Sequence, residues 1–249
     1  NGVLQKTYNL VSLNGSWSGT AQLGGAGDSV TVRLTDRFGR TSYDTITVNY
    51  LFEEISTGIV NLYTGCVNWG DYDNDGDLDL LVCGLTSDDT IVTKIYRNDG
   101  NNVFTDINAG LLGLEYGSAS WGDYNNDGYL DVLANGYDGT NYRTYIYQNN
   151  GNGSFSVVNN DLLGLGYTKA AFGDYDNDGD LDVLIMGYSS SNKGLLYRND
   201  IEANTFTLTA GNNIPQYNGY CSWGDYDNDG RLDFVIAGNR IYGSASGYC

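Results

Sequence analysis

Residues 71–82 read DYDNDGDLDLLV, in which aspartates at positions 71, 73, 75, 77 and 79 are followed at once by an apolar run. Carboxylates this close together repel one another, so the arrangement is unfavourable unless a cation binds among them. Closely similar stretches begin at Asp123, Asp174 and Asp225. The pattern therefore predicts a cation-binding loop that occurs four times in the chain.

The loops recur at intervals of about 51 residues, which is typical of a repeat architecture. Each loop follows a short segment that ends in WGD or FGD and precedes an apolar run such as LDLLVCG. A segment with a tyrosine, such as TKIYRND, and a last segment, such as NVFTDI, complete the unit. Four short antiparallel strands in about 50 residues are typical of a β-propeller blade. The apolar run does not alternate, so we expect both of its faces to be buried between neighbouring blades.

We therefore predict an all-β fold in which residues 61–249 form propeller blades, divided at about 61–113, 114–165, 166–216 and 217–249. Residues 1–52 do not follow the repeat. DSVTVRLTD and TSYDTITVNY alternate apolar and polar residues, as in a half-buried hairpin of a β-sandwich, and NLVSLNGSWSGTAQL can supply two more strands. Residues 53–60 are interpreted as the junction between the two parts.

The composition restricts the classes of function. The chain has 31 acidic and 12 basic residues and a net charge of −19, which argues against nucleic acid and anionic membrane as partners. It has no histidine, which excludes histidine-based catalysis and histidine-ligated zinc. We find neither an apolar run long enough to span a bilayer nor a signal peptide. Because the chain opens on Asn1, we expect a mature product or a part of a longer protein.

Each loop offers oxygen ligands at fixed positions: side chains at positions one, three, five and nine, and the backbone carbonyl at position seven, which a glycine at position six turns inward. The predicted ligands are Asp71, Asp73, Asp75, Asp77 and Asp79; Asp123, Asn125, Asp127, Tyr129 and Asp131; Asp174, Asp176, Asp178, Asp180 and Asp182; and Asp225, Asp227, Asp229, Arg231 and Asp233. Calcium takes six to eight oxygen ligands in loose geometry, so we expect about four Ca²⁺ ions. The second site is expected to be the weakest, because Asn125 lowers its charge.

Two other interpretations of the loops were weighed. An EF-hand needs a glutamate at position twelve and flanking helices, whereas position twelve here is Val82, Ala134, Ile185 or Ile236 in a β-rich run. Acidic surface turns without a metal are the simpler alternative, and four loops in register argue against it.

The loops, the W/F-G-D before them and the segment IYRNDGNNVFTDINAGL at 95–111 closely resemble FG-GAP/VCBS repeats, the blades of integrin-α-like β-propellers. The resemblance covers about residues 60–249. It implies a calcium-stabilised propeller in an extracellular or cell-surface protein, often one used in adhesion or carbohydrate binding. Residues 20–50 look like the closing strands of an Ig-like module of bacterial surface proteins.

The number of repeats departs from this family, whose propellers usually close with seven blades. The chain has three whole units and the start of a fourth, so the ring is small, open or part of a longer chain. A five-bladed ring is possible if the N-terminal hairpin supplies a blade. An unfinished blade at one end and a half-sandwich at the other would need covering strands, from the same longer polypeptide or from a neighbouring copy bound head to tail.

Covalent modifications are also predicted. Cys66 and Cys83 flank the first loop and would face each other across a hairpin, so we favour disulfides Cys66–Cys83 and Cys221–Cys249, with free buried thiols as the alternative. The sequons at Asn14 and Asn152 lie in glycine-rich turns and are candidate N-glycosylation sites.

Three functions follow from these patterns. The first is a secreted or cell-surface structural or adhesion module stabilised by calcium, with other copies of itself, carbohydrate or surface proteins as partners. The second is a calcium-dependent, lectin-like propeller, because the 22 tyrosines include candidate platforms for sugars, although blade packing is the favoured explanation of the tyrosines. An enzyme is disfavoured, because the chain lacks histidine, a G-x-S-x-G motif and a carboxylate pair apart from the loops.

Overall fold

The computed structural model of the protein describes residues 5–12, 15–22, 29–35, 41–47, 55–158, 161–167, 169–203, 205–210 and 218–239. These residues form strands, turns and connecting segments without a helix, so the all-β prediction is confirmed for them. Accordingly, the described residues contain no helix suited to crossing a membrane. The chain divides into two compact units, Asn1–Ser56 and Thr57–Cys249, with the boundary inside the predicted junction 53–60.

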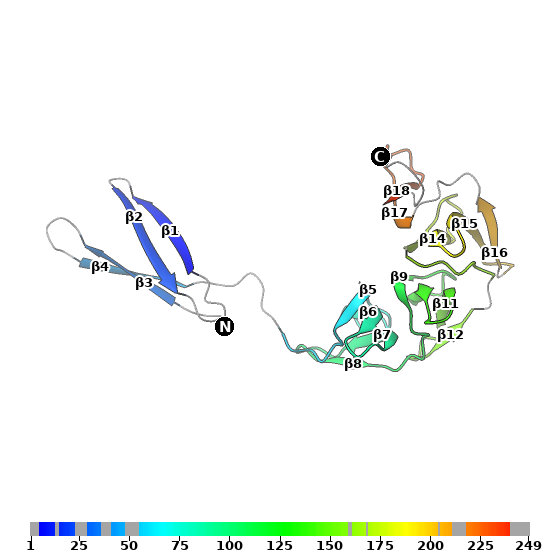
Figure 1. Ribbon diagram of the computed structural model, residues 1–249, viewed down its shortest axis with the longest axis horizontal. Helices are drawn as coiled ribbons and strands as arrows, with labels where there is room; N and C mark the ends of the chain where they lie inside the picture. The colour runs from blue at the N-terminus through cyan, green and yellow to red at the C-terminus, as the bar shows by residue number, and fades with distance from the viewer. Residues whose placement is uncertain are drawn as a thin grey trace. The chain divides into compact units, whose positions relative to one another are not determined.

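The described backbone of the first unit forms two antiparallel hairpins (Figure 1). Strand β1 (Gln5–Ser12) pairs with β2 (Gly15–Gln22), and β3 (Ser29–Thr35) pairs with β4 (Thr41–Thr47). The β3–β4 hairpin lies where the alternating pattern predicts it. An Ig-like sandwich built from these strands stays a prediction.

The second unit is a row of small antiparallel sheets in which spatial order follows chain order (Figure 1). Three blades have four strands each, and the described part of the fourth has two. The strands are β5 (Leu62–Gly70), β6 (Asp79–Thr86), β7 (Ile91–Asn98) and β8 (Phe104–Asp106); β9 (Glu115–Gly122), β10 (Asp131–Tyr137), β11 (Tyr142–Asn149) and β12 (Phe155–Val157); β13 (Ala170–Gly173), β14 (Asp182–Tyr188), β15 (Asn192–Asp200) and β16 (Thr205–Ala210); and β17 (Asn218–Gly224) and β18 (Asp233–Asn239).

The second strand of each complete blade is almost entirely buried. Its first six residues are buried in β6, β10 and β14 alike, as the continuous apolar runs predict. Leu81, Leu133 and Leu184 lie at its centre and are fully buried. Burying a leucine side chain contributes about 1.5–3 kcal/mol, so this strand anchors each blade.

The blades pack face to face through these buried residues. One apolar cluster joins the first blade to the second and includes Leu81, Ile95 and Val132, and another joins the second blade to the third and includes Leu133, Ile146 and Ile185. Contacts between first strands continue the row from β5 to β9, β13 and β17. No closed ring is seen among the described residues, so a small ring, or a fifth blade from the N-terminal hairpin, stays a prediction.

Candidate metal centres

Each aspartate-rich loop connects the first strand of a blade to the second and folds around its own first carboxylate. In the first loop, Asp71 accepts hydrogen bonds from the backbone N–H groups of Asp75 at 3.1 Å and Gly76 at 3.1 Å. Asp123, Asp174 and Asp225 accept the equivalent pairs of bonds in their loops. The same backbone path is therefore built four times from the same residue types.

The tight path of the loop needs two residues with a left-handed backbone. Asn74 at position four has φ of 60°, and Gly76 at position six has φ of 95°, a region that residues with a side chain rarely adopt. The other three loops repeat both features, with φ of 58–60° at Asn126, Asn177 and Asn228 and 85–91° at the glycines. Asparagine and glycine are the residues that tolerate these conformations at least cost, which explains the recurring N-D-G.

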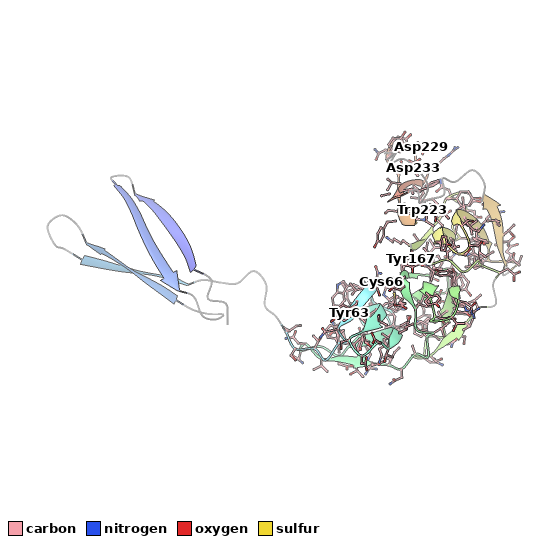
Figure 2. The ribbon with its side chains drawn as sticks, viewed as in Figure 1. Tyr63, Cys66, Tyr167, Trp223, Asp229 and Asp233 are labelled. Atoms are coloured by element: carbon pink, nitrogen blue, oxygen red, sulfur yellow. The ribbon has the colours of Figure 1, made fainter. Side chains whose placement is uncertain are left out.

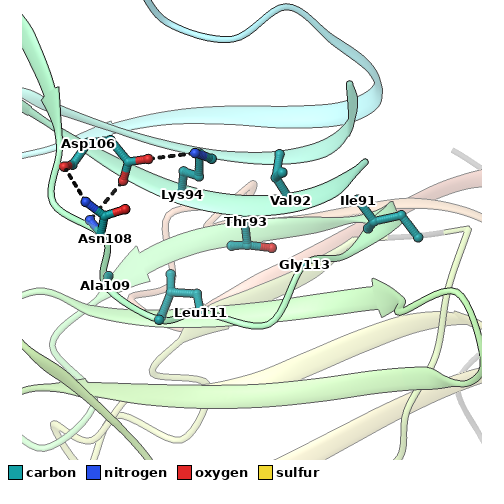
Figure 3. A pocket seen from close by; sticks show the side chains of 10 residues that line it. Ile91, Val92, Thr93, Lys94, Asp106, Asn108, Ala109, Leu111 and Gly113 are labelled. Carbon is teal, nitrogen blue, oxygen red and sulfur yellow. Dashed lines mark hydrogen bonds and ion pairs between the residues drawn. The ribbon is translucent and has the colours of Figure 1, made fainter. Parts of the chain in front are cut away.

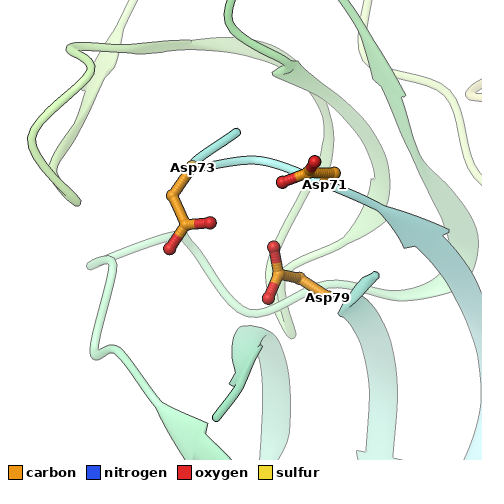
Figure 4. Close-up of side chains that lie close together, drawn as sticks. All are labelled: Asp71, Asp73 and Asp79. Carbon is orange, nitrogen blue, oxygen red and sulfur yellow. The ribbon is translucent and has the colours of Figure 1, made fainter. Parts of the chain in front are cut away.

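Carboxylates converge inside three of the loops. Asp71, Asp73 and Asp79 each place an oxygen within 4.8 Å of the others (Figure 4), and Asp174, Asp176 and Asp182 repeat this arrangement. In the fourth loop the converging residues are Asp225, Asp227 and Asp229. The structure thus brings together predicted ligands one, three and nine in two loops, and one, three and five in another.

Several predicted ligands have other contacts. Asp75, at position five, accepts a hydrogen bond at 2.9 Å from the N–H of Asp77. Asp127, Asp178 and Asp229 accept the same bond from Tyr129, Asp180 and Arg231, the residues at position seven. The predicted role of the position-seven carbonyls stays a prediction.

The second loop differs from the others at position three. Asn125 donates from Nδ2 to Asp127 at 3.0 Å, so an amide dipole is set against a carboxylate where the first and third loops have a second negative charge. This arrangement lowers the repulsion that a cation would relieve. It is consistent with the expectation that the second site is the weakest.

In the third loop a positive charge comes from the protein itself. Arg198 on β15 forms ion pairs of 2.9 Å with Asp176 and 2.9 Å with Asp178, and this guanidinium lowers the pKa of Asp178. The equivalent Arg97 of the first blade pairs with Asp99 instead, at 2.7 Å. A cation that binds the third loop therefore competes with Arg198, which the sequence pattern did not indicate.

The aspartate at position nine is fully buried in each of the first three loops. Asp79 accepts hydrogen bonds from the N–H groups of Tyr72 at 3.1 Å and Asn98 at 2.8 Å, so it joins the loop to the third strand. Burial disfavours its charged form and raises its pKa to about 6, against the opposing effect of these two bonds. Burial likewise raises the pKa of Asp131 to about 7 and that of Asp182 to about 6.

The donor set of the first loop fits a hard cation. Asp73 has one carboxylate oxygen that is buried without a hydrogen-bond partner, next to Asp71 and Asp79. Burial, followed by the charges of Asp75 and Asp71, raises the pKa of Asp73. A buried, unpartnered oxygen among carboxylates is unfavourable, and coordination of a divalent cation by these oxygens would satisfy it. These clusters can therefore hold a metal ion.

A buried asparagine in the third strand links the second and third blades to the loop of the blade before each. Asn149 donates from its side chain to the carbonyls of Leu130 at 3.2 Å and Tyr72 at 2.7 Å, and Tyr72 belongs to the preceding loop. Asn199 makes the same two bonds, to Leu181 at 3.2 Å and Tyr124 at 2.8 Å. This role is not predicted by the repeat pattern, although an asparagine recurs after each I/L-Y-R/Q.

The loops are also linked directly to one another. Asn74 at position four donates from its side chain to the carbonyl of Gly128 in the second loop, at 3.0 Å. Asn126 donates to Gly179 at 3.1 Å, and Asn177 donates to Gly230 at 2.7 Å. Each described loop is thereby tied to the next by one amide–carbonyl bond.

The cysteines of the first blade lie as the hairpin predicts. Cys66 and Cys83 are paired residues of β5 and β6, and their Sγ atoms are 2.8 Å apart as free thiols. The hydrogen bond between them lowers the pKa of Cys66 and raises that of Cys83. The disulfide itself stays a prediction. Cys221 is buried as a free thiol, and its proposed partner Cys249 lies outside the described residues.

Of the two sequons, only one falls in the described part of the chain. Asn152 lies exposed in the β11–β12 turn, where its Oδ1 accepts hydrogen bonds from the backbone N–H and hydroxyl of Ser154. Asn14 is outside the described residues. Glycosylation of either site stays a prediction.

A pocket of about 260 Å³ lies away from the loops, between β7 and the segment 106–113 (Figure 3). Its charged residues, Lys94 and Asp106, form an ion pair of 2.6 Å and so neutralise one another. The remaining lining residues are mostly small or aliphatic, such as Val92 and Leu111. The pocket therefore offers no free charged group to a ligand.

Comparison with known proteins agrees with the repeat. A family model described as an FG-GAP-like repeat matches residues 71–134, 123–185 and 174–236, each match starting at the first aspartate of a loop and ending beyond the next loop. No curated protein matches the chain. The overlapping family matches run from 71 to 236, more than half of the chain, and the chain belongs to the FG-GAP-like repeat family.

Proposed function

We propose that the chain is a calcium-binding structural and adhesion module of a secreted or cell-surface protein, and that it has no enzymatic activity. The observation that carries the proposal is the convergence of three carboxylates inside a loop that joins two strands of a blade, as at Asp71, Asp73 and Asp79. FG-GAP-like repeats are typical of extracellular and surface proteins, which supports the proposed location.

Calcium is the proposed ion because the donors are carboxylate and carbonyl oxygens on a short, adaptable loop. Magnesium requires a strict octahedron and retains its water, whereas calcium accepts more oxygens in looser geometry. About four ions would bind, one for each loop. Bound calcium would offset the repulsion within each loop and hold the first and second strands of a blade together.

The test is the effect of calcium removal on stability. Extracellular calcium sites have Kd values of about 10⁻⁴–10⁻³ M, so millimolar calcium should contribute roughly 0.4–1.4 kcal/mol for each occupied site. EDTA should therefore lower the melting temperature clearly. Asp71→Asn should reduce the response to calcium, whereas Glu202→Gln, an exposed acidic residue outside the loops, serves as the matched control. An identical melting curve with calcium and with EDTA would refute the proposal.

A cluster of tyrosines favours a second candidate, a lectin-like propeller. The rings of Tyr116 and Tyr167 stack at 4.9 Å, and Tyr142 lies 6.2 Å from Tyr167, 5.4 Å from Tyr137 and 6.1 Å from Tyr188. Tyr116, Tyr137, Tyr142 and Tyr188 come from the strand ends opposite the aspartate loops of the second and third blades, and Tyr167 precedes β13. Tyr167 is 45% exposed, and an exposed ring beside hydroxyl groups suits the apolar face of a sugar.

The backbone holds these rings in place. Tyr116 and Tyr167 have φ of 51° and 57°, and Thr64 at the equivalent position of the first blade has φ of 49°, so this conformation belongs to the blade repeat and the tyrosine rings are what distinguishes the cluster. A glycan array with the calcium-loaded protein is the test. Tyr167→Ala should abolish any binding, whereas Tyr63→Ala, an exposed tyrosine of the first blade, should not. Binding that survives Tyr167→Ala would exclude this cluster as the sugar site.

A further inference from the structure

The joint between neighbouring blades is built from a glycine and an aromatic ring. A Cβ atom added at Gly70 would lie 2.5 Å from the ring of Trp121 in the next blade. At Gly122 the ring of Phe172 would be 2.5 Å away, and at Gly173 the ring of Trp223 would be 2.6 Å away. In the first three blades the last residue of the first strand is therefore a glycine against which the next blade inserts a ring.

The same joint buries the tyrosine at position two of the loop. Tyr72 is 2% exposed and lies against Trp121 and Phe155 of the second blade, at 6.2 and 6.0 Å between ring centroids. Tyr124 is 5% exposed and lies 6.0 Å from Phe206 of the third blade. A blade thus offers a glycine and a tyrosine to its successor, which covers both with aromatic rings.

In the described part of the chain, no following blade covers the equivalent glycine and tyrosine of the fourth blade. A Cβ atom at Gly224 would meet no atom within 4 Å, and Tyr226 is 82% exposed. Val235 on β18 is 58% exposed, although it occupies the repeat position of the buried Leu133 and Leu184, which pack toward the following blade. Figure 2 shows Trp223 on this blade, where it already fills the joint with the third blade. We call Gly224, Tyr226 and Val235 the acceptor face.

The first blade exposes the aromatic ring that, in the later blades, packs against the glycine of the preceding blade. Trp69 occupies the repeat position of Trp121, Phe172 and Trp223, yet it is 57% exposed. Tyr63, Val67 and Leu78 of the same blade are also exposed, and Figure 2 shows Tyr63 near the start of the row. We call Tyr63, Val67, Trp69 and Leu78 the donor face.

We propose that the donor face of one copy of this chain binds the acceptor face of a second copy, with Trp69 inserted against Gly224. This inference rests on the proposed structural function and names a partner for it. The two faces carry the residue types that meet at all three internal joints, so each fits the other better than it fits itself. Such a head-to-tail contact makes a closed ring if its rotation closes and a filament if it does not.

The internal joints also indicate how the loops would meet. Asn228 occupies the position from which Asn74, Asn126 and Asn177 donate to the next loop, and Gly76 occupies the accepting position. Docking therefore brings the fourth loop of one copy beside the first loop of another. Because both loops are strongly acidic, assembly is expected to require a divalent cation.

Two variants separate the two faces. Trp69→Asp removes the inserted ring, and Gly224→Leu fills the space against which the ring would pack. Gly224 lies in open space within one chain, so the leucine should not disturb folding. Val157→Ser, which changes an exposed apolar residue of β12 outside both faces, is the control. Sedimentation or light scattering in calcium then gives the size of each species.

Wild type and Val157→Ser should form assemblies that grow with concentration, and each face variant alone should stay monomeric. An equimolar mixture of Trp69→Asp and Gly224→Leu should form a heterodimer and nothing larger, because one intact face remains on each. The proposal would be overturned by a wild type that stays monomeric or by a Gly224→Leu chain that assembles like wild type. Either result would mean that the acceptor face is not covered by the donor face of a second copy. Both face variants still have all four loops, so their response to EDTA tests calcium binding independently of assembly.

Discussion

Asn149→Ala tests how strongly the blades are coupled. The Asn149 side chain is almost fully buried and donates to Leu130 of its own blade and to Tyr72 of the preceding blade, while its Oδ1 accepts from the N–H of Gly151 at 3.0 Å. Leaving a buried polar group without its partner costs about 1–3 kcal/mol. The variant should therefore lose both the local bonds and the bond between blades.

Asn98→Ala is the matched control for this measurement. Asn98 occupies the same position in the first blade and makes the equivalent local bonds, to Leu78 at 3.1 Å and from Gly100 at 3.1 Å. In the described structure it makes no bond to a preceding blade. The free energy of unfolding should therefore fall by about 1–3 kcal/mol more for Asn149→Ala than for Asn98→Ala.

Urea unfolding in calcium, followed by tryptophan fluorescence, measures this difference. With an m-value of about 2 kcal/mol/M, a loss of about 2 kcal/mol moves the midpoint by about 1 M. Asn199→Ala should behave like Asn149→Ala, because its bond to Tyr124 repeats the one to Tyr72. Equal midpoints for Asn149→Ala and Asn98→Ala would show that the bond between blades contributes nothing to stability.

Two further predictions follow from the titratable groups. Burial raises the pKa values of Asp79 and Asp182 to about 6 and that of Asp131 to about 7 in the calcium-free chain. A carboxyl with a raised pKa in the folded state stabilises fully below its unfolded pKa, and this contribution is lost as the pH rises through the folded value. The melting temperature in EDTA should thus fall between about pH 4 and pH 7, from the unfolded to the folded pKa values, and saturating calcium should remove the fall. A flat profile in EDTA would contradict this. Mass mapping without reductant should find Cys66 linked to Cys83, and two free thiols in freshly isolated protein would count against secretion.

The features predictable from the sequence are those that recur in register. Three local patterns are of this kind: the first aspartate of each loop, the glycine at position six and the buried run after the loop. The structure has all three where they were expected. The buried second strand follows because its apolar residues do not alternate. Repetition made these assignments stronger than any single segment would allow.

The contacts of individual long or aromatic side chains were not predictable in the same way. The pairing of Arg198 with Asp176 and Asp178 depends on which rotamer a long side chain adopts near two carboxylates, and Arg97 at the equivalent position makes a different choice. The stacking of Tyr116 on Tyr167 depends on a left-handed backbone at both residues. Tyrosine seldom adopts this conformation, so the sequence does not predict it.

The amide–carbonyl bonds from Asn74, Asn126 and Asn177 to the following loops have a consequence for cooperativity. Metal binding that orders one loop also fixes its hydrogen bond to the next loop. The next loop then loses less conformational entropy when it binds its own ion, so that ion binds more tightly. Such coupling is reciprocal, and a coupling free energy of about 1 kcal/mol raises the affinity of the adjacent site about fivefold. A calcium titration should accordingly be steeper than an isotherm for independent sites. Inner loops have two neighbours and outer loops one, so the inner sites would gain the most affinity from this coupling.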